Sequence, residues 1–568
     1  MHGSFDVYLT QPRPQVTQLD NMPLLDRSLV DYEKYNRFIG QSMVKNCLSL
    51  QATRGCPYKC AYCHKIWPKK HFVRSAGNIF AEIELYYKMG VKRFAFVDDI
   101  FNFNVKNSTE FYRLIIKNRL KVQLFFPNGL RGDILTKDYI DLMVDAGTVN
   151  IAFALETGSP RIQKLIRKNL NIEKLRDNIE YTCKTYPEII VELQTMHGFP
   201  TETEEEAMKT LDFIFNLKWL DFPYINILKI FPHTDMEKLA VENGVSRADI
   251  AKSRDLTYDE LPATLPFNKG FSYKYQAKFL HEYFLLKERL LSVLPHQMKL
   301  FTEDELIQKY NSYLPGKFNG LPDLLEIAGI GEDELEEKNC IAEEVYFAPR
   351  LNEKIREYFP EKEHERNPLK ILLLDLSLFF REGRNVLYNV VEPPLGLMYL
   401  MSYLNQQKGG QVQGKIAKSR IDFENYDELR IMLEEFKPDV IGVRTLTLFA
   451  RFFHETTAKI VNWGCDAPII VGGPYATSDY KSVLKDTNVD LVVLGEGEIT
   501  FCEVITKIME NNGKLLGDDI LKEIPGIVFV SGRSPERKAE VGISLSEETI
   551  QKRRNRRLVQ FNDDLEDE

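Results

Sequence analysis

The stretch Arg54-Gly-Cys-Pro-Tyr-Lys-Cys-Ala-Tyr-Cys-His64 decides how this chain is interpreted. It places Cys56, Cys60 and Cys63 in a C-x3-C-x2-C spacing, directly after a predicted strand at 48–54. Three thiolates on one loop can bind three irons of a cubane [4Fe–4S] cluster, which normally takes four protein ligands. Because no fourth cysteine lies nearby, one iron is left open, and an open metal position is typical of a catalytic site.

Two other interpretations of this loop stay open. A structural zinc site would need His64 or His71 as its fourth ligand, although zinc motifs favour C-x2-C pairs. Free thiols without a metal are the second alternative. The remaining cysteines are dispersed, so we expect neither a disulfide framework nor an auxiliary cluster. They are Cys47, Cys183, Cys340, Cys465 and Cys502.

Length and composition restrict the class of protein. A chain of 568 residues is long enough for roughly three or four domains. Its 44% apolar and 28% charged residues are typical of a globular protein, and its net charge of −9 gives no support for a nucleic-acid partner. No apolar run approaches the ~18 residues that cross a bilayer, and the first residues lack the features of a secretion signal. We therefore expect a cytoplasmic protein.

Residues 43–240 alternate β-rich runs with amphipathic helical stretches. The strands are predicted at 48–54, 93–99, 122–131, 149–156, 189–198 and 224–232, and the helices at 76–89, 109–118, 137–146, 160–183 and 204–217. Strands that alternate with helices pair in parallel, because each crossover returns the chain to the same end of the sheet. The pattern predicts a partial (β/α)6 barrel with its chemistry at the carboxyl ends of the strands.

The rest of the chain divides into further units. Residues 1–42 are predicted to be a lead or linker, 241–367 a helical bridging region, and 536–568 a charged tail. Residues 368–535 form a second α/β unit, whose short strands are apolar on both faces, as in a doubly wound parallel sheet. These strands are predicted at 369–376, 439–445, 467–473, 490–495 and 526–530.

The cysteine spacing, with the aromatic Tyr62 before the last cysteine, resembles the signature of the radical S-adenosylmethionine superfamily. The resemblance covers residues 43–240. It implies that S-adenosylmethionine chelates the open iron and is cleaved by an electron from the cluster. The resulting 5′-deoxyadenosyl radical abstracts hydrogen from an unactivated carbon. The resemblance also implies an external reductant of the flavodoxin or ferredoxin type.

The same resemblance implies contacts to S-adenosylmethionine from the strand ends. The residues expected there, together with Tyr62, are Asp98, Asp99, Arg131, Glu156 and Gln194. Asp98 or Asp99 would accept from the methionine ammonium group, and Arg131 would pair with the carboxylate. Glu156 would be an acidic contact to the nucleoside or the methionine. A strand-end carboxylate can instead cap the next helix, and His197 can be structural or can exchange a proton with substrate.

The second α/β unit resembles the cobalamin-binding domain that accompanies many of these enzymes, over residues 368–535. By that resemblance Thr445, Leu446 and Thr447 flank the nucleotide tail, Gly472 and Gly473 line it, and Gly495, Glu496, Gly497 and Glu498 close the site. The D-x-H-x-x-G motif that supplies a histidine to cobalt is absent. The domain follows the barrel, which suggests a circular permutation. A flavodoxin-like domain that has lost cobalamin is the alternative.

These features lead to three hypotheses of function. The first is a cobalamin-dependent radical S-adenosylmethionine methyltransferase that acts on an unactivated carbon of a small molecule or peptide. The second is cyclisation, epimerisation or rearrangement, with cobalamin redox-active, structural or absent. The third is a cobalamin or redox sensor without turnover. The sequence identifies neither the substrate nor the residues that would act as acid, base or hydrogen donor.

Overall fold

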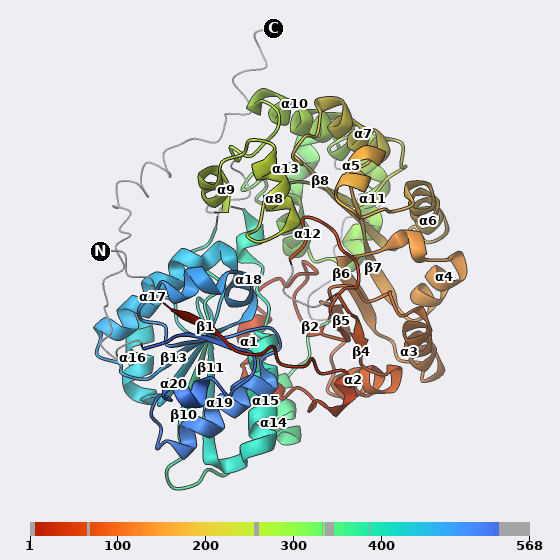
Figure 1. Cartoon of the computed structure of the whole chain (residues 1–568). Helices are drawn as coiled ribbons and strands as arrows, with labels where there is room; N and C mark the ends of the chain where they lie inside the picture. The colour runs from red at the N-terminus through yellow and green to blue at the C-terminus, as the bar shows by residue number, and fades with distance from the viewer. Residues whose placement is uncertain are drawn as a thin grey trace.

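The computed structural model describes residues 6–64, 69–254, 261–331, 333–335, 346–383 and 385–532. These residues form a six-stranded sheet, a seven-stranded sheet and a two-stranded ribbon, with helices around both large sheets (Figure 1). Within these ranges no helix is both long and apolar enough to cross a bilayer. The charged tail expected at 536–568 and Cys340 lie outside the described residues.

The six-stranded sheet confirms the predicted partial barrel. Its strands are all parallel and follow the order β2-β5-β6-β7-β8-β9. They are β2 Cys47–Leu50, β5 Arg93–Phe96, β6 Gln123–Leu130, β7 Thr148–Glu156, β8 Ile190–His197 and β9 Phe222–Ile227. The carboxyl ends of these strands meet at one edge, which we call the barrel edge.

The first predicted strand is split in two. After β2 the chain forms a separate strand, β3 Thr53–Arg54, which pairs antiparallel with β4 Phe72–Val73. Asp98 holds the break, because its Oδ1 accepts from the backbone N–H of Ala52 at 2.9 Å and from Thr53 Oγ1 at 2.8 Å. A carboxylate that accepts these donors satisfies backbone groups that leave the strand ladder.

The helices between the barrel strands lie close to their predicted positions, with one exception. They are α2 Ala76–Lys88, α3 Val105–Lys117, α4 Lys137–Asp145, α5 Pro160–Leu165, α6 Ile172–Thr185 and α7 Glu204–Phe215. The single helix predicted at 160–183 is therefore wrong. Arg167 and Asn169 adopt left-handed backbone conformations, with φ of 57° and 47°, and end the helix there. The break leaves Lys168 outside both helices.

The bridging region is helical, as predicted, and packs against the barrel. Its elements are α8 Asp235–Glu242, α9 Arg247–Arg254, α10 Lys269–Phe279, a π-helical turn η4 Leu280–Phe284, α11 Lys287–Leu300, α12 Glu303–Asn311, α13 Leu321–Ile327 and α14 Leu351–Tyr358. Two buried ion pairs join α12 to the barrel. Arg93 on β5 lies 2.7 Å from Glu305, and Lys309 lies 2.7 Å from Glu192 on β8.

The seven-stranded sheet has the order β1-β15-β14-β13-β12-β10-β11. Its strands are β1 Val7–Leu9, β10 Leu369–Asp375, β11 Val412–Lys418, β12 Val440–Arg444, β13 Ile469–Gly472, β14 Leu491–Val493 and β15 Ile527–Val530. Strands β10 to β14 are parallel and have the flavodoxin-like order, with the switch point between β10 and β12. We call their carboxyl ends the second edge.

Three strands of this sheet differ from the sequence interpretation. β11 was not predicted, and β15 and β1 differ in direction or position. β15 pairs antiparallel with β14, so the prediction of a further parallel strand at 526–530 is wrong. β1 lies within the segment predicted as a lead or linker, and it pairs antiparallel with β15 at the sheet edge (Figure 1). Thr10 continues this contact through its backbone N–H and its hydroxyl, which both donate to Ile527 O. The N-terminal segment thus closes the C-terminal sheet.

The helices of this domain cover both faces of the sheet. They are α15 Leu395–Lys408, α16 Tyr426–Phe436, α17 Ala450–Asn462, α18 Gly473–Leu484, α19 Glu498–Glu510 and the short α20 Asp518–Leu521. Helices α16 to α18 enclose a separate core on one face. The apolar residues of α15 and α19 belong instead to the core that fills the barrel and the bridging region. One core therefore connects the two large sheets.

We expect the Arg93–Glu305 pair to dominate the docking of α12. Both side chains are fully buried, so Glu305→Gln leaves an uncompensated buried guanidinium and should lower the free energy of unfolding by about 3–5 kcal/mol. The matched control is Glu434→Gln, which removes an exposed ion pair with Arg430 on α16. This variant should change the free energy of unfolding by about 0.5 kcal/mol or less. Urea denaturation measures the free energy of unfolding of both variants. Equal effects would contradict the dominant role of the Arg93–Glu305 pair.

Candidate functional site

The three motif cysteines lie on one loop, residues 55–64, which we call the cluster loop. It leaves β3 at Gly55, whose φ of 81° needs a residue without a Cβ, and turns where Cys63 N–H donates to Cys60 O at 3.3 Å. All three thiols are free and half-buried. Burial raises the pKa of Cys63 to about 11 and also raises that of Cys56. The thiols of Cys56 and Cys63 therefore favour their protonated form until a cation replaces the protons.

The donor set fits a cubane better than a single zinc ion. In the described part of the chain, no three His, Cys, Asp or Glu side chains converge on one metal position. A cubane needs the three thiolates at three different irons, so they need not converge. His71 is engaged elsewhere, with Nε2 3.0 Å from Ile100 O, and the His64 ring packs against Phe231.

Tyr62 and Glu156, both predicted to lie at the S-adenosylmethionine site, are in contact. The Tyr62 hydroxyl donates to Glu156 Oε1 at 2.9 Å, and Lys168 Nζ lies 2.5 Å from the same oxygen. Glu156 ends β7 at a bulge, with a φ of 71°. Non-glycine residues with this backbone concentrate at functional sites. Sequence reasoning missed Lys168, because the helix break that allows it to contact Glu156 was not predicted.

The two adjacent aspartates of the barrel edge have different environments. Asp98 is buried, and burial raises its pKa to about 7, although the hydrogen bonds from Ala52 and Thr53 oppose this shift. It does not cap the next helix, which was the alternative left open by the sequence, because its hydrogen bonds go to the break between β2 and β3 and the N-cap of α3 is Asn104. Asp99 is exposed, and its charge acts on both Cys56 and Cys63. Of the two, Asp99 is the better placed to reach a ligand at the cluster.

Arg131 braces the cluster loop. Its guanidinium donates to both oxygens of Asp133 and to the backbone carbonyls of Lys168 and Asn169, at 2.9–3.2 Å. It also lies 4.2 Å from the ring centre of Tyr58, within the cluster loop. With these donors occupied, the predicted pairing with a ligand carboxylate would require Arg131 to exchange partners. Gln194 is half-buried on β8, beside Gly129.

His197 lies among aromatic rings, and neither of its ring nitrogens has a hydrogen-bond partner among the described residues. It is buried, with its ring centre 4.4 Å from that of Tyr275 and 6.1 Å from that of Phe267, both from the bridging region. Burial lowers the pKa of His197 to about 4. The imidazole is therefore neutral near pH 7 and enclosed by aromatic rings.

The residues predicted to bind cobalamin all lie at the second edge. Thr445 follows β12 and donates to Leu376 O at 2.8 Å; Leu446 and Thr447 come next, and Thr447 begins a 3-10 turn. Gly472 and Gly473 join β13 to α18, and Gly473 has a φ of 85°.

Gly495, with a φ of 70°, follows β14, and a Cβ built there would meet nothing within 4 Å. Backbone without side chains, at the carboxyl ends of parallel strands beside a switch point, is where such sheets bind ligands.

A buried charge cluster at the second edge was not predicted. Asp375 ends β10 and lies 2.8 Å from Lys418 Nζ and 3.0 Å from Arg444 Nη1. Burial would raise the pKa of Asp375, but the charges of Lys418 and Arg444 bring it down to about 2. The Arg444 side chain also contacts the position of a Cβ at Gly473. The sequence feature that could have predicted this cluster is the single charged residue at the end of each apolar strand.

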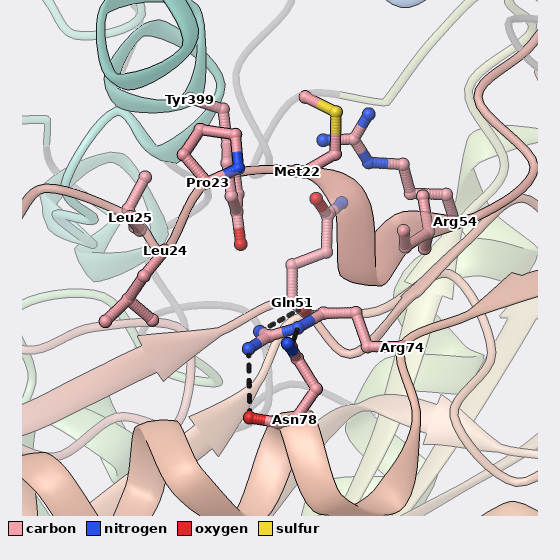
Figure 2. A pocket seen from close by; sticks show the side chains of 10 residues that line it. Met22, Pro23, Leu24, Leu25, Gln51, Arg54, Arg74, Asn78 and Tyr399 are labelled. Carbon is pink, nitrogen blue, oxygen red and sulfur yellow. Dashed lines mark hydrogen bonds between the residues drawn. The ribbon is translucent and has the colours of Figure 1, made fainter. Parts of the chain in front are cut away.

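Two contacts join the barrel edge to the second edge. Arg54 precedes the cluster loop and lies 2.6 Å from Glu498 and 3.9 Å from Glu496. His233, after β9, lies 3.6 Å from Asp479 on α18. Arg54 also lines a pocket between the N-terminal segment, α2 and α15 (Figure 2). Its other lining residues are Leu19, Met22, Pro23, Leu24, Leu25, Gln51, Arg74, Asn78 and Tyr399.

Two protein-family models match separate parts of the chain. Residues 50–214 match the model of the radical SAM superfamily, and residues 386–505 match that of the B12 binding domain. The chain carries a radical S-adenosylmethionine domain and a cobalamin-binding domain. Its cofactors are accordingly a [4Fe–4S] cluster, S-adenosylmethionine and cobalamin, as predicted from the sequence.

Curated relatives share part of the chain. An uncharacterized methyltransferase of Pyrococcus horikoshii is 25% identical over 41% of this chain and 50% of its own length. Cytidylyl-2-hydroxyethylphosphonate methyltransferase of Streptomyces wedmorensis is 28% identical over 29% and 32%. A ribosomal protein uS12 methylthiotransferase of Pseudothermotoga lettingae is 26% identical over 34% and 46%. The chain spans half or less of the length of these relatives.

Solved structures are similar at a lower level. The radical S-adenosylmethionine methyltransferase TsrM from Kitasatospora setae, with cobalamin and a [4Fe–4S] cluster bound, is 19% identical with a TM-score of 0.32. It covers 37% of this chain and 38% of its own. Methylornithine synthase is 11% identical with a TM-score of 0.29, covering 55% and 82%.

We expect each of Cys56→Ala, Cys60→Ala and Cys63→Ala to lose the cluster, because each thiolate would hold a different iron. Iron and sulfide content and the spectrum of the reduced protein measure this loss, and 5′-deoxyadenosine formation should stop. The control is Cys183→Ala on α6, another half-buried cysteine, which should keep the cluster. A full cluster in Cys60→Ala would refute the assignment.

His197 makes stability depend on pH. The unfolded chain protonates this histidine near its ordinary pKa of 6.5, whereas the folded chain does so only near 4. Stability should therefore fall as the pH drops through this range, by about 2 kcal/mol between pH 7 and pH 5. His197→Gln should lose this dependence, while His281→Gln, at an exposed histidine, should keep it. Denaturation at both pH values tests this, and an unchanged slope in His197→Gln would contradict the burial argument.

Proposed function

We propose that the protein is a cobalamin-dependent radical S-adenosylmethionine methyltransferase acting on an unactivated carbon. The observation that carries this proposal is the contact of Arg54, directly before the cluster loop, with Glu498, the first residue of α19. A methyl transfer that uses both cofactors needs them at one cavity, and this contact holds their loops together. The curated relatives named as methyltransferases support the same class of reaction.

The chain's own residues would divide the work between binding and support. Cys56, Cys60 and Cys63 would hold the cluster, which supplies the electron that cleaves S-adenosylmethionine. Asp99, Glu156 and Gln194 are the proposed contacts to S-adenosylmethionine, with Tyr62 and Lys168 orienting Glu156. Asp98 and Arg131 would act by bracing the loop rather than by direct contact.

At the second edge, the backbone would form most of the cobalamin site. Thr445, Leu446 and Thr447 would flank the nucleotide tail, and Gly472, Gly473 and the loop Gly495–Glu498 would line it. His454 would not reach cobalt, because it lies on α17 and its ring nitrogens contact Asp486 at 2.9 Å and Tyr475 at 3.2 Å.

The proposal names the substrate and the electron donor only by class. We propose a small molecule or a peptide as the substrate, and a flavodoxin or ferredoxin as the electron donor. The net charge of −9 gives no support for a nucleic-acid substrate.

Two products of S-adenosylmethionine distinguish the hypotheses without a known substrate. The protein should be reconstituted anaerobically with iron, sulfide and hydroxocobalamin, then reduced and given S-adenosylmethionine. We expect both S-adenosylhomocysteine, from methyl transfer, and 5′-deoxyadenosine, from radical cleavage. Formation of 5′-deoxyadenosine alone would support cyclisation, epimerisation or rearrangement, and neither product would support a sensor.

A matched glycine pair tests the cobalamin site. Gly495→Leu and Gly464→Leu each add a side chain at a left-handed position where a Cβ meets nothing within 4 Å, so each has a similar strain of about 1–2 kcal/mol. We expect Gly495→Leu to lose cobalamin retention and S-adenosylhomocysteine formation. Gly464→Leu, after α17 and before β13, should keep both. Equal cobalamin retention would exclude the loop Gly495–Glu498 from the site.

A further inference from the structure

Three buried charged side chains form a joint between the two domains. Arg54 lies two residues before Cys56, while Glu496 follows β14 and Glu498 is the first residue of α19. Arg54 Nη2 donates to Glu498 Oε1 at 2.6 Å, and Arg54 Nη1 lies 3.9 Å from Glu496 Oε1. We call these three residues the cofactor joint. It connects the segment that leads into the cluster loop with the loop proposed to close the cobalamin site.

The joint is nearly dry. Each of its three side chains is only 7% exposed, so each charge has lost most of its hydration. Removing one partner from such a group leaves a buried charge without compensation, which is more unfavourable than losing an exposed ion pair. The positions of the two loops are therefore strongly dependent on each other.

Neighbouring contacts restrict the joint further. The Arg54 guanidinium lies 5.4 Å from the ring centre of Tyr399 on α15. In Figure 2, Arg54 and Tyr399 line the same pocket, together with Met22 of the N-terminal segment. The backbone N–H of Val16, in that segment, donates to Glu496 Oε2 at 3.0 Å. Three parts of the chain thus meet at Arg54.

One half of the joint is open. Arg54 Nη1 and Glu496 Oε1 are both buried, and neither has a hydrogen-bond partner among the described residues. At 3.9 Å they are about 1 Å too far apart for a hydrogen bond. A shift of that size in the loop Gly495–Glu498 would close the second contact. Closing this contact would give the joint a second arrangement, and a ligand that contacts either loop could favour one of the two.

We propose that Arg54 is a positioning residue that couples the two cofactor sites. Through Glu498 and Glu496 it transmits the position of the loop Gly495–Glu498 to the cluster loop, so that a ligand bound at either site strengthens binding at the other. The proposal rests on the cobalamin contacts proposed above, but it does not depend on methyl transfer. By thermodynamic linkage, S-adenosylmethionine must raise the affinity for cobalamin by the same factor as the reverse.

The coupling can be measured without turnover. The protein is loaded with its cluster in the oxidised state, which cannot donate the electron that cleaves S-adenosylmethionine. Binding of hydroxocobalamin is then titrated by its absorption spectrum, with and without saturating S-adenosylmethionine. We expect S-adenosylmethionine to raise the cobalamin affinity of the wild-type protein by about tenfold.

Variants on both sides of the joint test whether the coupling between the two sites passes through Arg54 and Glu498. In Arg54→Gln and in Glu498→Gln the coupling, which is the ratio of cobalamin affinities with and without S-adenosylmethionine, should fall to about onefold whatever the affinity of each variant for hydroxocobalamin alone. Glu498→Gln leaves the cluster loop unaltered, so it keeps the test valid if Arg54→Gln loses the cluster. The double variant should be no worse than either single variant, and Arg54→Lys should restore part of the coupling.

A burial-matched control separates coupling from general destabilisation. Arg93→Gln removes another buried Arg–Glu pair, between β5 and α12, and should lower stability while keeping the wild-type coupling. Wild-type coupling in Glu498→Gln, or no coupling in the wild-type protein, would overturn the proposal. If Gly495→Leu retains cobalamin, the cobalamin assignment fails instead, and the two failures are therefore distinguishable.

Discussion

The packing of two sheets against one shared apolar core is the constraint on which the rest of this structure depends. The same buried cluster extends from the barrel strands through α10, α11 and α12 to α15 and α19. Apolar burial stabilises by about 25 cal/mol per Å², and the two domains cannot separate without exposing this surface. The shared core therefore holds the barrel edge and the second edge next to each other.

Apolar burial is not directional, so buried charges determine the alignment of the two domains. Arg54 pairs with Glu498 across the contact. Arg27, from the N-terminal segment, and Arg74, after β4, both pair with Glu82 on α2. A misaligned contact between the two domains would leave Arg54 and Glu498 buried without partners, which is strongly unfavourable. The N-terminal segment takes part in this alignment, because it also supplies β1 to the C-terminal sheet.

Local patterns were sufficient to predict most elements but not their exceptions. The alternation of strands and helices predicted the six parallel strands, since periodicity depends on near neighbours in the chain. Strand β11 has mixed polarity and was missed, and the antiparallel direction of β15 depends on its neighbour β14 rather than on its own residues. The interruption at Arg167 depends on left-handed backbone, which the apolar pattern of 160–183 did not indicate.

The sequence by itself determined the chemistry: three cysteines in a C-x3-C-x2-C spacing, and glycines at the ends of apolar strands. Those features are local, because ligand spacing and backbone freedom depend on residues next to each other in the chain. Only the tertiary structure decided which side chains serve that chemistry. Asp98 and Arg131 have the right residue type, yet the fold uses them as braces, whereas Arg54 acquires its partners from residues more than 440 positions away. Buried electrostatic pairing depends on distance in space, and sequence separation does not report it.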